Sequence, residues 1–315
     1  MELGRPNLEE FASTLIDLAQ TDRDLLIVTG DSRGSGKLWP FAKAYPQQVV
    51  EVGIAEQNLV GIAAGLASTG KRVFAVSPAC FLTARGLEQI KNDVAYSDNP
   101  VKLVGISAGV SYGALGSTHH SLHDYAVLRA INNLDIVAPA DNFETREAIK
   151  AAATHPRPIY LRFGKKPMPH LHAPDTTFNI GKALTIQDGN DVTFIAIGEP
   201  VGRALAAAQR LEADGVRCRV ISMHTLRPFD TETVLHAARN TSALVTVEEH
   251  SVYGGLGEAC AATLMEHGIQ LPFRIVGIPD EYTVTGSQFE IFDHYGINET
   301  GLAQTARQLL QVEPA

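Results

Sequence analysis

Short apolar runs alternate with helix-forming segments along almost the whole chain, and this alternation limits the possible folds more than any other feature. The run LLIVT at 25–29 has no charged residue inside it and follows a segment whose apolar residues recur at helical spacing. Strands that are apolar along their whole length are typical of parallel sheets, because helices cover both faces of such sheets. The sequence therefore predicts an α/β fold.

The predicted elements fall into two blocks. In the first, strands are expected at 25–29, 49–52, 73–76, 101–106, 135–138 and 159–162, and helices from Asn7, which is positioned to cap its helix, and at 56–68, 83–96, 124–131 and 144–154. In the second, strands are expected at 192–197, 218–221, 243–247 and 273–276, and helices at 201–214, 230–238, 256–267 and 300–310.

Between the blocks, the stretch KKPMPHLHAPDTT has three prolines and no periodicity, which is typical of a linker. We therefore predict two domains, at 1–165 and 182–315, joined by a linker at 166–181. Each domain is expected to be a largely parallel sheet flanked by helices.

Composition excludes several classes of protein. Of the 315 residues, 45% are hydrophobic, which is enough for two cores, yet no apolar run approaches the length of a bilayer. A net charge of −9, with both signs interspersed, argues against a nucleic-acid groove. The three cysteines fit neither a disulfide framework nor a zinc site. We expect a cytoplasmic protein with no membrane or nucleic-acid partner.

Three stretches contain side chains suited to chemistry. In EVGIAEQNLVGIAAG (51–65), Glu56 opens a small-residue helix at the carboxyl edge of the predicted sheet, where ligand crevices form; it could also merely complement the helix dipole. In SPACFLTARGLEQIKND (77–93), Phe81 offers a flat ring, although a single Phe is more often core. In GVSYGALGSTHHSLHD (109–124), His119, His120 and His123 crowd together without a recognisable fourth metal ligand, so no metal site is predicted.

Together these stretches resemble the transketolase family and its split, two-subunit relatives. The second block is similar to the family's C-terminal domain in RVISMHTLRPFD (219–230) and EEHSVYGGLGE (248–258), so the resemblance covers the whole chain. It implies that Glu56 activates the aminopyrimidine of thiamine diphosphate, that Phe81 stacks on this ring, and that His119 binds the donor sugar and moves protons at its reacting carbon. His120 and His123 are interpreted as helix-start or interface residues.

The resemblance also aligns Arg5, Ser35 and Arg162 with substrate-binding positions that contact a phosphate. Two positions depart from the family pattern: Ser107 replaces a phosphate-binding histidine, and Leu115 replaces an aspartate that reads a donor hydroxyl. We therefore expect an anionic ketose, different from the standard ones or bound in a different pose, to pass a two-carbon unit to an aldehyde acceptor.

One family feature is missing. The Gly-Asp-Gly motif that holds Mg²⁺ and the diphosphate does not occur, since Asp31 is followed by Ser32. The resemblance therefore implies an N-terminal, diphosphate-binding partner subunit that supplies the Mg²⁺ ligands, in an α2β2 heterotetramer. The alternatives are a β subunit of a 2-oxoacid dehydrogenase E1 component and a non-catalytic regulatory homologue.

Overall fold

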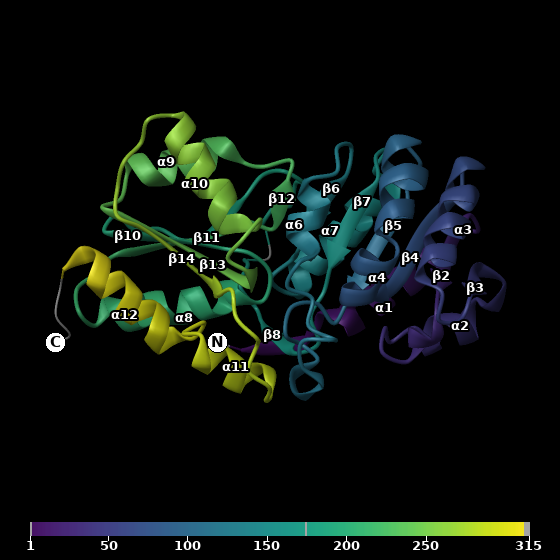
Figure 1. Cartoon of the computed structure of the whole chain (residues 1–315), viewed down its shortest axis with the longest axis horizontal. Helices are drawn as coiled ribbons and strands as arrows, with labels where there is room; N and C mark the ends of the chain where they lie inside the picture. The colour runs from purple at the N-terminus through teal and green to yellow at the C-terminus, as the bar shows by residue number, and fades with distance from the viewer. Residues whose placement is uncertain (1, 174, 312–315) are drawn as a thin grey trace.

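The chain forms two α/β blocks that lie side by side in the computed structural model, which describes residues 2–173 and 175–311 (Figure 1). The last residues of the predicted second domain, 312–315, lie outside the described residues. None of the helices within the described ranges is long and apolar enough to cross a bilayer.

A seven-stranded sheet forms the centre of the first block, in the order β12-β6-β7-β5-β4-β2-β3. Strands β2 to β7 run parallel, and β12 pairs antiparallel with β6 at one edge. The strands are β2 Leu25–Thr29, β3 Val49–Glu51, β4 Arg72–Pro78, β5 Lys102–Ile106, β6 Asp135–Val137, β7 Ile159–Arg162 and β12 Thr225–Arg227.

Helices cover both faces of this sheet because neighbouring strand residues point to opposite sides. In β4, Val73 and Ala75 pack in the cluster that contains α3, whereas Phe74 and Val76 pack in the cluster that contains α1 and α7. The helices are α1 Asn7–Ala19, α2 Trp39–Ala44, α3 Glu56–Ser68, α4 Ala79–Arg85, α5 Leu87–Gln89, α6 Asp124–Arg129 and α7 Asn142–Thr154, with a π-helix at Ile90–Tyr96 and 3₁₀ turns at Asp31–Arg33, Pro46–Gln48 and Gly113–Leu115.

The second block contains a five-stranded sheet in the order β14-β13-β10-β11-β9, in which only β9 runs antiparallel to its neighbour. Its strands are β9 Leu184–Gln187, β10 Val192–Ala196, β11 Cys218–Ser222, β13 Ala243–Ser251 and β14 Phe273–Ile278. Its helices are α8 Pro200–Glu212, α9 Thr231–Arg239, α10 Leu256–Glu266, α11 Gln288–His294 and α12 Glu299–Leu310. Helices α8 and α12 cover one face, and α9 and α10 cover the other.

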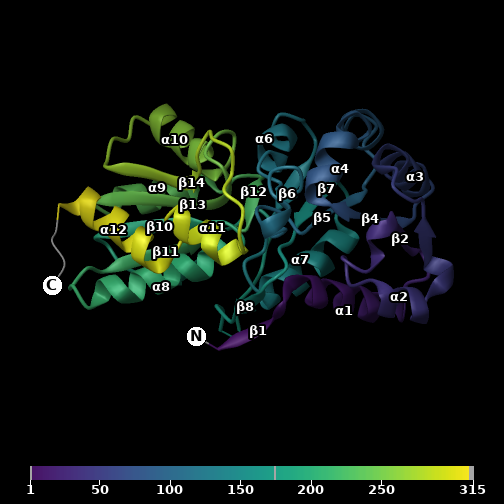
Figure 2. The same cartoon turned by 60° about the horizontal axis from the view of Figure 1, so that its bottom comes forward.

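The two blocks share structure at their junction. Strand β12 comes from the second half of the chain but completes the sheet of the first block. One hydrophobic cluster includes Tyr160 of the first block together with Ile195 and Leu226 of the second half. A short antiparallel ribbon, β1 (Leu3–Pro6) with β8 (Pro167–Pro169), also lies at the junction, as Figure 2 shows. The two blocks are therefore in direct contact, and the predicted domain bounds and linker stay a prediction.

Most long predicted elements are confirmed, including the bounds of the helix at 56–68 and the strand at 159–162. The expected cap of the first helix was wrong: Pro6 occupies the cap position, and the Asn7 side chain accepts a hydrogen bond from Asn142 at 2.9 Å instead. The prediction of a single helix at 83–96 was also wrong, because this helical segment is longer and interrupted. It begins at Ala79, breaks at Gly86 and ends as a π-helix.

Candidate active site

Glu56 lies in the first turn of α3, directly after the turn that leaves β3. Gly53 makes this turn with φ +72°, a conformation that favours glycine. The Glu56 side chain is only 8% exposed, and both of its oxygens accept hydrogen bonds from Nη1 of Arg85, at 3.2 and 3.1 Å. Arg85 itself is 49% exposed, so this carboxylate is paired with a cation that solvent can reach.

Arg85 also connects Glu56 with Phe81. Arg85 and Phe81 lie on α4, four positions apart and hence on one helix face. The guanidinium carbon lies 4.2 Å from the centre of the Phe81 ring, within the range of a cation–π contact. The planar guanidinium group of Arg85 therefore contacts both the Glu56 carboxylate and the Phe81 ring.

His119 continues this row of contacts. Its ring meets Phe81 edge-on, with ring centres 5.2 Å apart, and meets Tyr112 in the same way at 5.4 Å. Its Nδ1 lies 3.0 Å from the Thr118 hydroxyl. Among the described residues, Nε2 has no hydrogen-bond partner, and the ring is partly exposed, so this nitrogen is available to a ligand.

The far end of the row is cationic. The ammonium group of Lys165 lies 4.4 Å from the centre of the Tyr112 ring. Burial lowers the pKa of Lys165, and the nearby charges of Lys37 and Lys166 lower it further. The structure thus gathers three like charges at this position.

Tyr112 brings the two serines of the expected phosphate cluster to the same end. Burial raises the pKa of Tyr112, and polar interactions with Ser107 and Ser35 partly oppose this effect. Arg5 lies beyond them, in a groove that Gly34 and Lys37 also line. Its guanidinium pairs with Glu10 at 2.5 Å, so Arg5 is near the cationic end but already has a carboxylate partner.

We call the sequence of contacts Glu56–Arg85–Phe81–His119–Tyr112–Lys165 the open row. It contains three of the predicted site residues, Glu56, Phe81 and His119. Leu115, at the position where the family pattern has an aspartate, lies on the 3₁₀ turn four residues before His119 and is 56% exposed.

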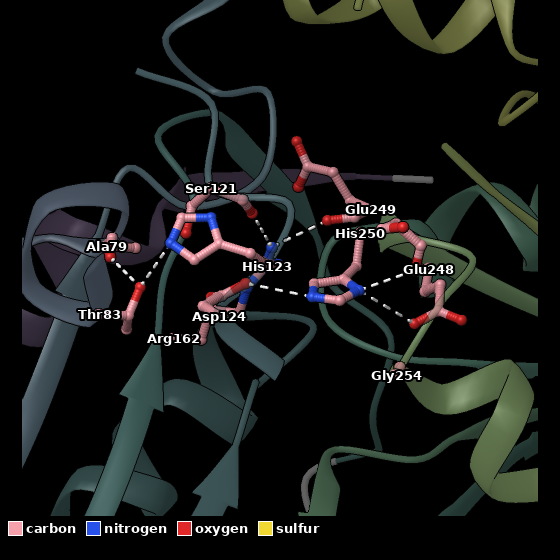
Figure 3. A network of polar contacts seen from close by, with 12 residues as sticks. Ala79, Thr83, Ser121, His123, Asp124, Arg162, Glu248, Glu249, His250 and Gly254 are labelled. Carbon is pink, nitrogen blue, oxygen red and sulfur yellow. Dashed lines mark hydrogen bonds and ion pairs between the residues drawn. The ribbon is translucent and has the colours of Figure 1, made fainter. Parts of the chain in front are cut away.

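Arg162 lies elsewhere, in a buried network between the two blocks (Figure 3). Its Nε donates to Asp124 at 2.8 Å, and its Nη2 donates to the backbone oxygens of Ser121 and Glu249 at 3.2 and 2.8 Å. Burial opposes its charge, but the Asp124 carboxylate holds the pKa of Arg162 above its usual range. The phosphate contact predicted for Arg162 stays a prediction, and this geometry favours a structural role.

The network contains further buried groups. Asp124 also accepts a hydrogen bond from Tyr160 at 2.8 Å, and His250 stacks on Tyr125 with ring centres 4.9 Å apart. Burial lowers the pKa of His250 to about 4. A neutral His250 therefore adds no second cation beside Arg162 at physiological pH.

The other two histidines lie off the row. His120 is buried and donates from Nε2 to the backbone oxygen of Gly113 at 2.8 Å. His123 occupies the cap position of α6, and its Nε2 lies 3.2 Å from the Thr83 hydroxyl. His123 thus lies at a helix start, and the interpretation of both as helix-start or interface residues stays a prediction. Within the described ranges, no three His, Cys, Asp or Glu side chains are grouped so as to hold a metal.

Sequence reasoning missed Arg85, Tyr112 and Lys165. The four-residue spacing from Phe81 could have indicated Arg85, because it places both side chains on one helix face. Tyr112 and Lys165 come from separate loops, and only the folded chain brings them together.

The two-block α/β fold brings Glu56, Phe81 and His119 into one row of contacts through Arg85. Residues 8–169 match the family model for the transketolase pyrimidine-binding domain, and residues 181–302 match the transketolase C-terminal domain. The chain therefore belongs to the transketolase family of thiamine-dependent transferases.

Relatives and solved structures agree with this. The chain is 48% identical, over 304 residues, to an apulose-4-phosphate transketolase subunit of Phocaeicola vulgatus, covering 96% of this chain and 97% of that protein. It is 33% identical to a 6-deoxy-6-sulfo-D-fructose transketolase subunit of a Clostridium species, covering 96% and 94%. A solved structure described as "Split gene transketolase, inactive beta4 tetramer" superposes with a TM-score of 0.90 at 35% identity, covering 99% and 100%.

Proposed function

We propose that this chain is the part of a split transketolase that contributes Glu56 and His119 to the active site, while the diphosphate is held through Mg²⁺ by a separate N-terminal subunit. The observation that carries the proposal is the open row, in which a buried carboxylate, an aromatic face and a histidine follow one another in contact. The two named relatives, both transketolase subunits, favour this over the β subunit of a 2-oxoacid dehydrogenase.

The residues present fit thiamine diphosphate. The Arg85 guanidinium is planar and carries N–H donors, and it lies between the Glu56 oxygens and the Phe81 face. An aminopyrimidine is likewise planar and carries N–H donors, so Glu56 and Phe81 would hold it once Arg85 moves aside. When bound, the cofactor supplies an electron sink for cleavage of the bond next to a ketose carbonyl.

The chain's own residues would then position groups and hold protons. Glu56, whose side chain is 8% exposed, would share a proton with the ring nitrogen N1′ through a hydrogen bond. His119 would donate a proton from Nε2 to the donor's carbonyl oxygen and take one back from the neighbouring hydroxyl as the bond between the two carbons breaks. The ring would then be as it began, before the two-carbon glycolaldehyde unit passes to an aldehyde acceptor. The Thr118 contact at Nδ1 orients the ring for this work.

The cationic end indicates the class of substrate. Lys165, with Lys37 and Lys166 beside it, would bind an anionic group at the end of the sugar, with hydroxyl donors from Tyr112 and Ser35. The exposed Leu115 offers no acceptor to a donor hydroxyl, which favours a sugar that differs there from the usual ketoses. Phosphate is the default anion, and the names of the two relatives include one phosphorylated and one sulfonated sugar.

The partner is expected to supply what this chain lacks. Mg²⁺ needs several oxygen ligands, and the described residues contain no three-residue cluster of acidic, His or Cys side chains for a metal. We expect an α2β2 heterotetramer, and the solved split-gene relative is described as an inactive β4 tetramer. We also expect a cytoplasmic location, because Cys80, Cys218 and Cys260 are buried as free thiols.

The test is reconstitution. The purified chain is mixed with an N-terminal diphosphate-binding subunit, thiamine diphosphate and Mg²⁺, and assayed for transfer of a two-carbon unit from phosphorylated ketoses to aldehydes. Transfer that requires both subunits supports the proposal. Decarboxylation of a 2-oxoacid with acylation of a lipoyl domain would support the dehydrogenase alternative, and no cofactor-dependent turnover by an assembled complex would support a regulatory homologue.

A further inference from the structure

The loop at 109–123, which carries His119, is held at both ends by the second block. Near its start, the Val110 backbone N–H donates to Oε1 of Glu249 at 2.9 Å. Near its end, the Leu122 backbone oxygen accepts a hydrogen bond from the Ser251 N–H at 3.1 Å. Glu249 and Ser251 both belong to β13, so a single strand of the C-terminal domain grips the two ends of this loop.

Gly109 shows how closely the Glu249 side chain approaches the loop. Its φ is +59°, and a Cβ added there would lie 2.2 Å from the Glu249 carboxyl carbon. Any larger residue would displace the carboxylate, since such a distance is far inside van der Waals contact. The loop start and Glu249 are therefore shaped to fit each other.

The Gln288 amide holds Glu249 at Oε1, the same oxygen that accepts from Val110. Nε2 of Gln288 donates to Glu249 at 2.8 Å and to Glu199 at 2.7 Å, so one amide nitrogen bridges two acids. Gln288 opens α11 and Glu199 precedes α8, and with β13 three separate elements of the C-terminal domain meet here. Glu249 is 1% exposed and Gln288 2%, so water does not compete for these bonds.

The charges around this group favour one neutral acid in the pair. Arg162 is the cation that faces both carboxylates, and Arg203 faces Glu199. Arg162, however, is already paired with Asp124 at 2.8 Å. Burial, with the adjacent Glu199 charge, raises the pKa of Glu249 to about 8.

We propose that Glu249 is a positioning residue for catalysis: through its bond to Val110, supported by Gln288 and Glu199, the C-terminal domain sets the loop that aims His119. Glu249 lies away from the open row and acts through the loop. The assignment of His119 to the donor sugar rests on the function proposed above, whereas the restraint of the loop by Glu249 can be measured without it.

The central variants are Glu249→Ala and Glu249→Gln. Alanine leaves the Val110 N–H without its acceptor, and we expect the reconstituted enzyme to lose roughly tenfold in kcat, with unchanged cofactor affinity. Glutamine can accept from both Val110 and Gln288 through its oxygen, as the glutamate does. It should therefore restore most of the activity.

The matched control is Glu258→Ala. Glu258 is an exposed carboxylate of the same domain that accepts a hydrogen bond from a backbone N–H, that of Gly254, at 2.7 Å, outside the loop. Its loss should leave kcat unchanged. If Glu249→Ala does not fold, Gln288→Met removes the bridge while keeping Glu249, and a smaller loss of kcat, roughly threefold, is expected.

Hydrogen–deuterium exchange of the isolated chain separates this inference from the proposed function. Exchange of peptides covering 109–123 should be faster in Glu249→Ala than in the wild type or Glu258→Ala, whether or not the reconstituted complex transfers two-carbon units. Unchanged exchange there, or wild-type kcat in folded Glu249→Ala and Gln288→Met, would overturn the positioning role. Faster exchange without any transferase activity in the wild-type complex would instead count against the proposed function alone.

Discussion

Two arginine–carboxylate pairs in this molecule differ in how far solvent reaches them. In the open row, Arg85 meets Glu56 at 3.1 Å, and the arginine side chain is 49% exposed. In the buried network, Arg162 meets Asp124 at 2.8 Å, and the two side chains are 5% and 0% exposed. Separating Arg85 from Glu56 costs little free energy because water can solvate the arginine. Separating Arg162 from Asp124 costs much more because both charges are buried. A site that must accept a ligand needs the first kind of pair, and a junction between domains uses the second.

The unpaired groups differ in the same way. The open row ends in Lys165, which faces two like charges, and includes a histidine nitrogen without a partner among the described residues. In the buried network, each hydrogen-bonding group of Arg162 named above meets a carboxylate or a backbone oxygen. The network also contains polar atoms without a hydrogen-bond partner among the described residues, such as Oδ1 of Asp124 and Nε2 of His250, but these are buried. Free bonding capacity is therefore available to a ligand only in the open row, where solvent reaches it.

The largest expected effect is in the open row. Glu56→Gln should lower turnover of the reconstituted enzyme on the order of 10³-fold, because the amide cannot hold a proton at the pyrimidine nitrogen. Stability should change little. Steady-state kinetics and thermal unfolding check both statements, with Glu88→Gln, an acid in the first turn of α5, as the control. Near-normal turnover in Glu56→Gln would contradict the proposal that the open row is part of the active site.

In the buried network, the largest effect should be on stability. Arg162→Met leaves Asp124 as a buried charge without its partner and should lower the free energy of unfolding by about 3–5 kcal/mol. The double variant with Asp124→Asn should recover part of this loss. Denaturant unfolding measures both. A loss below about 1 kcal/mol, accompanied by a large rise in KM for a phosphorylated sugar, would return Arg162 to the substrate site.

Lys165→Gln tests the cationic end of the row. We expect KM for a phosphorylated donor to rise roughly 10- to 100-fold, since a charge-assisted hydrogen bond is lost, with little change for the unphosphorylated ketose. Lys71→Gln, an exposed lysine paired with Asp24, is the control. Equal effects on both sugars would mean that Lys165 does not bind the anion.

The buried network should also make stability depend on pH. Burial raises the pKa of Glu248 to about 7 and that of Glu249 to about 8. Both acids therefore bind protons more tightly in the folded state, so their contribution is complete below the ordinary carboxyl pKa and is lost as pH rises to 7–8. Between about pH 5 and 8 the free energy of unfolding should fall with pH less steeply in Glu249→Gln than in the wild type. The difference in slope should be up to about 1.4 kcal/mol per pH unit. Parallel wild-type and variant curves would show that Glu249 titrates normally.

The smallest expected effect is that of Arg85→Met. Removing an exposed partner should change the free energy of unfolding by less than about 1 kcal/mol, in contrast with Arg162→Met. Denaturant unfolding of the two variants side by side is the direct comparison. A loss from Arg85→Met as large as that from Arg162→Met would break the distinction between the two pairs.

Much of the fold could be predicted because its signals are local. Helix 56–68 and strand 159–162 were found with their bounds, since apolar spacing is set by neighbours in sequence. The short strands β1, β8 and β12 were not, because three or four residues carry no period and their partners lie far along the chain. For the same reason, the stretch at 166–181 was predicted as a linker without a strand, although β8 lies within it.

The sequence by itself determined the α/β class, the family and the placing of Glu56, Phe81 and His119 on loops or the first turns of helices, because motif and period are written in consecutive residues. Only the tertiary structure decided which charges are accessible. Arg85, Arg162 and Lys165 are all cations at or just beyond the end of a helix or strand. Arg85 covers the Glu56 carboxylate, Arg162 is buried between the two blocks, and Lys165 lies near other lysines. Burial is set by what packs against a side chain from distant segments, and that determines whether a charge holds the fold or binds a ligand.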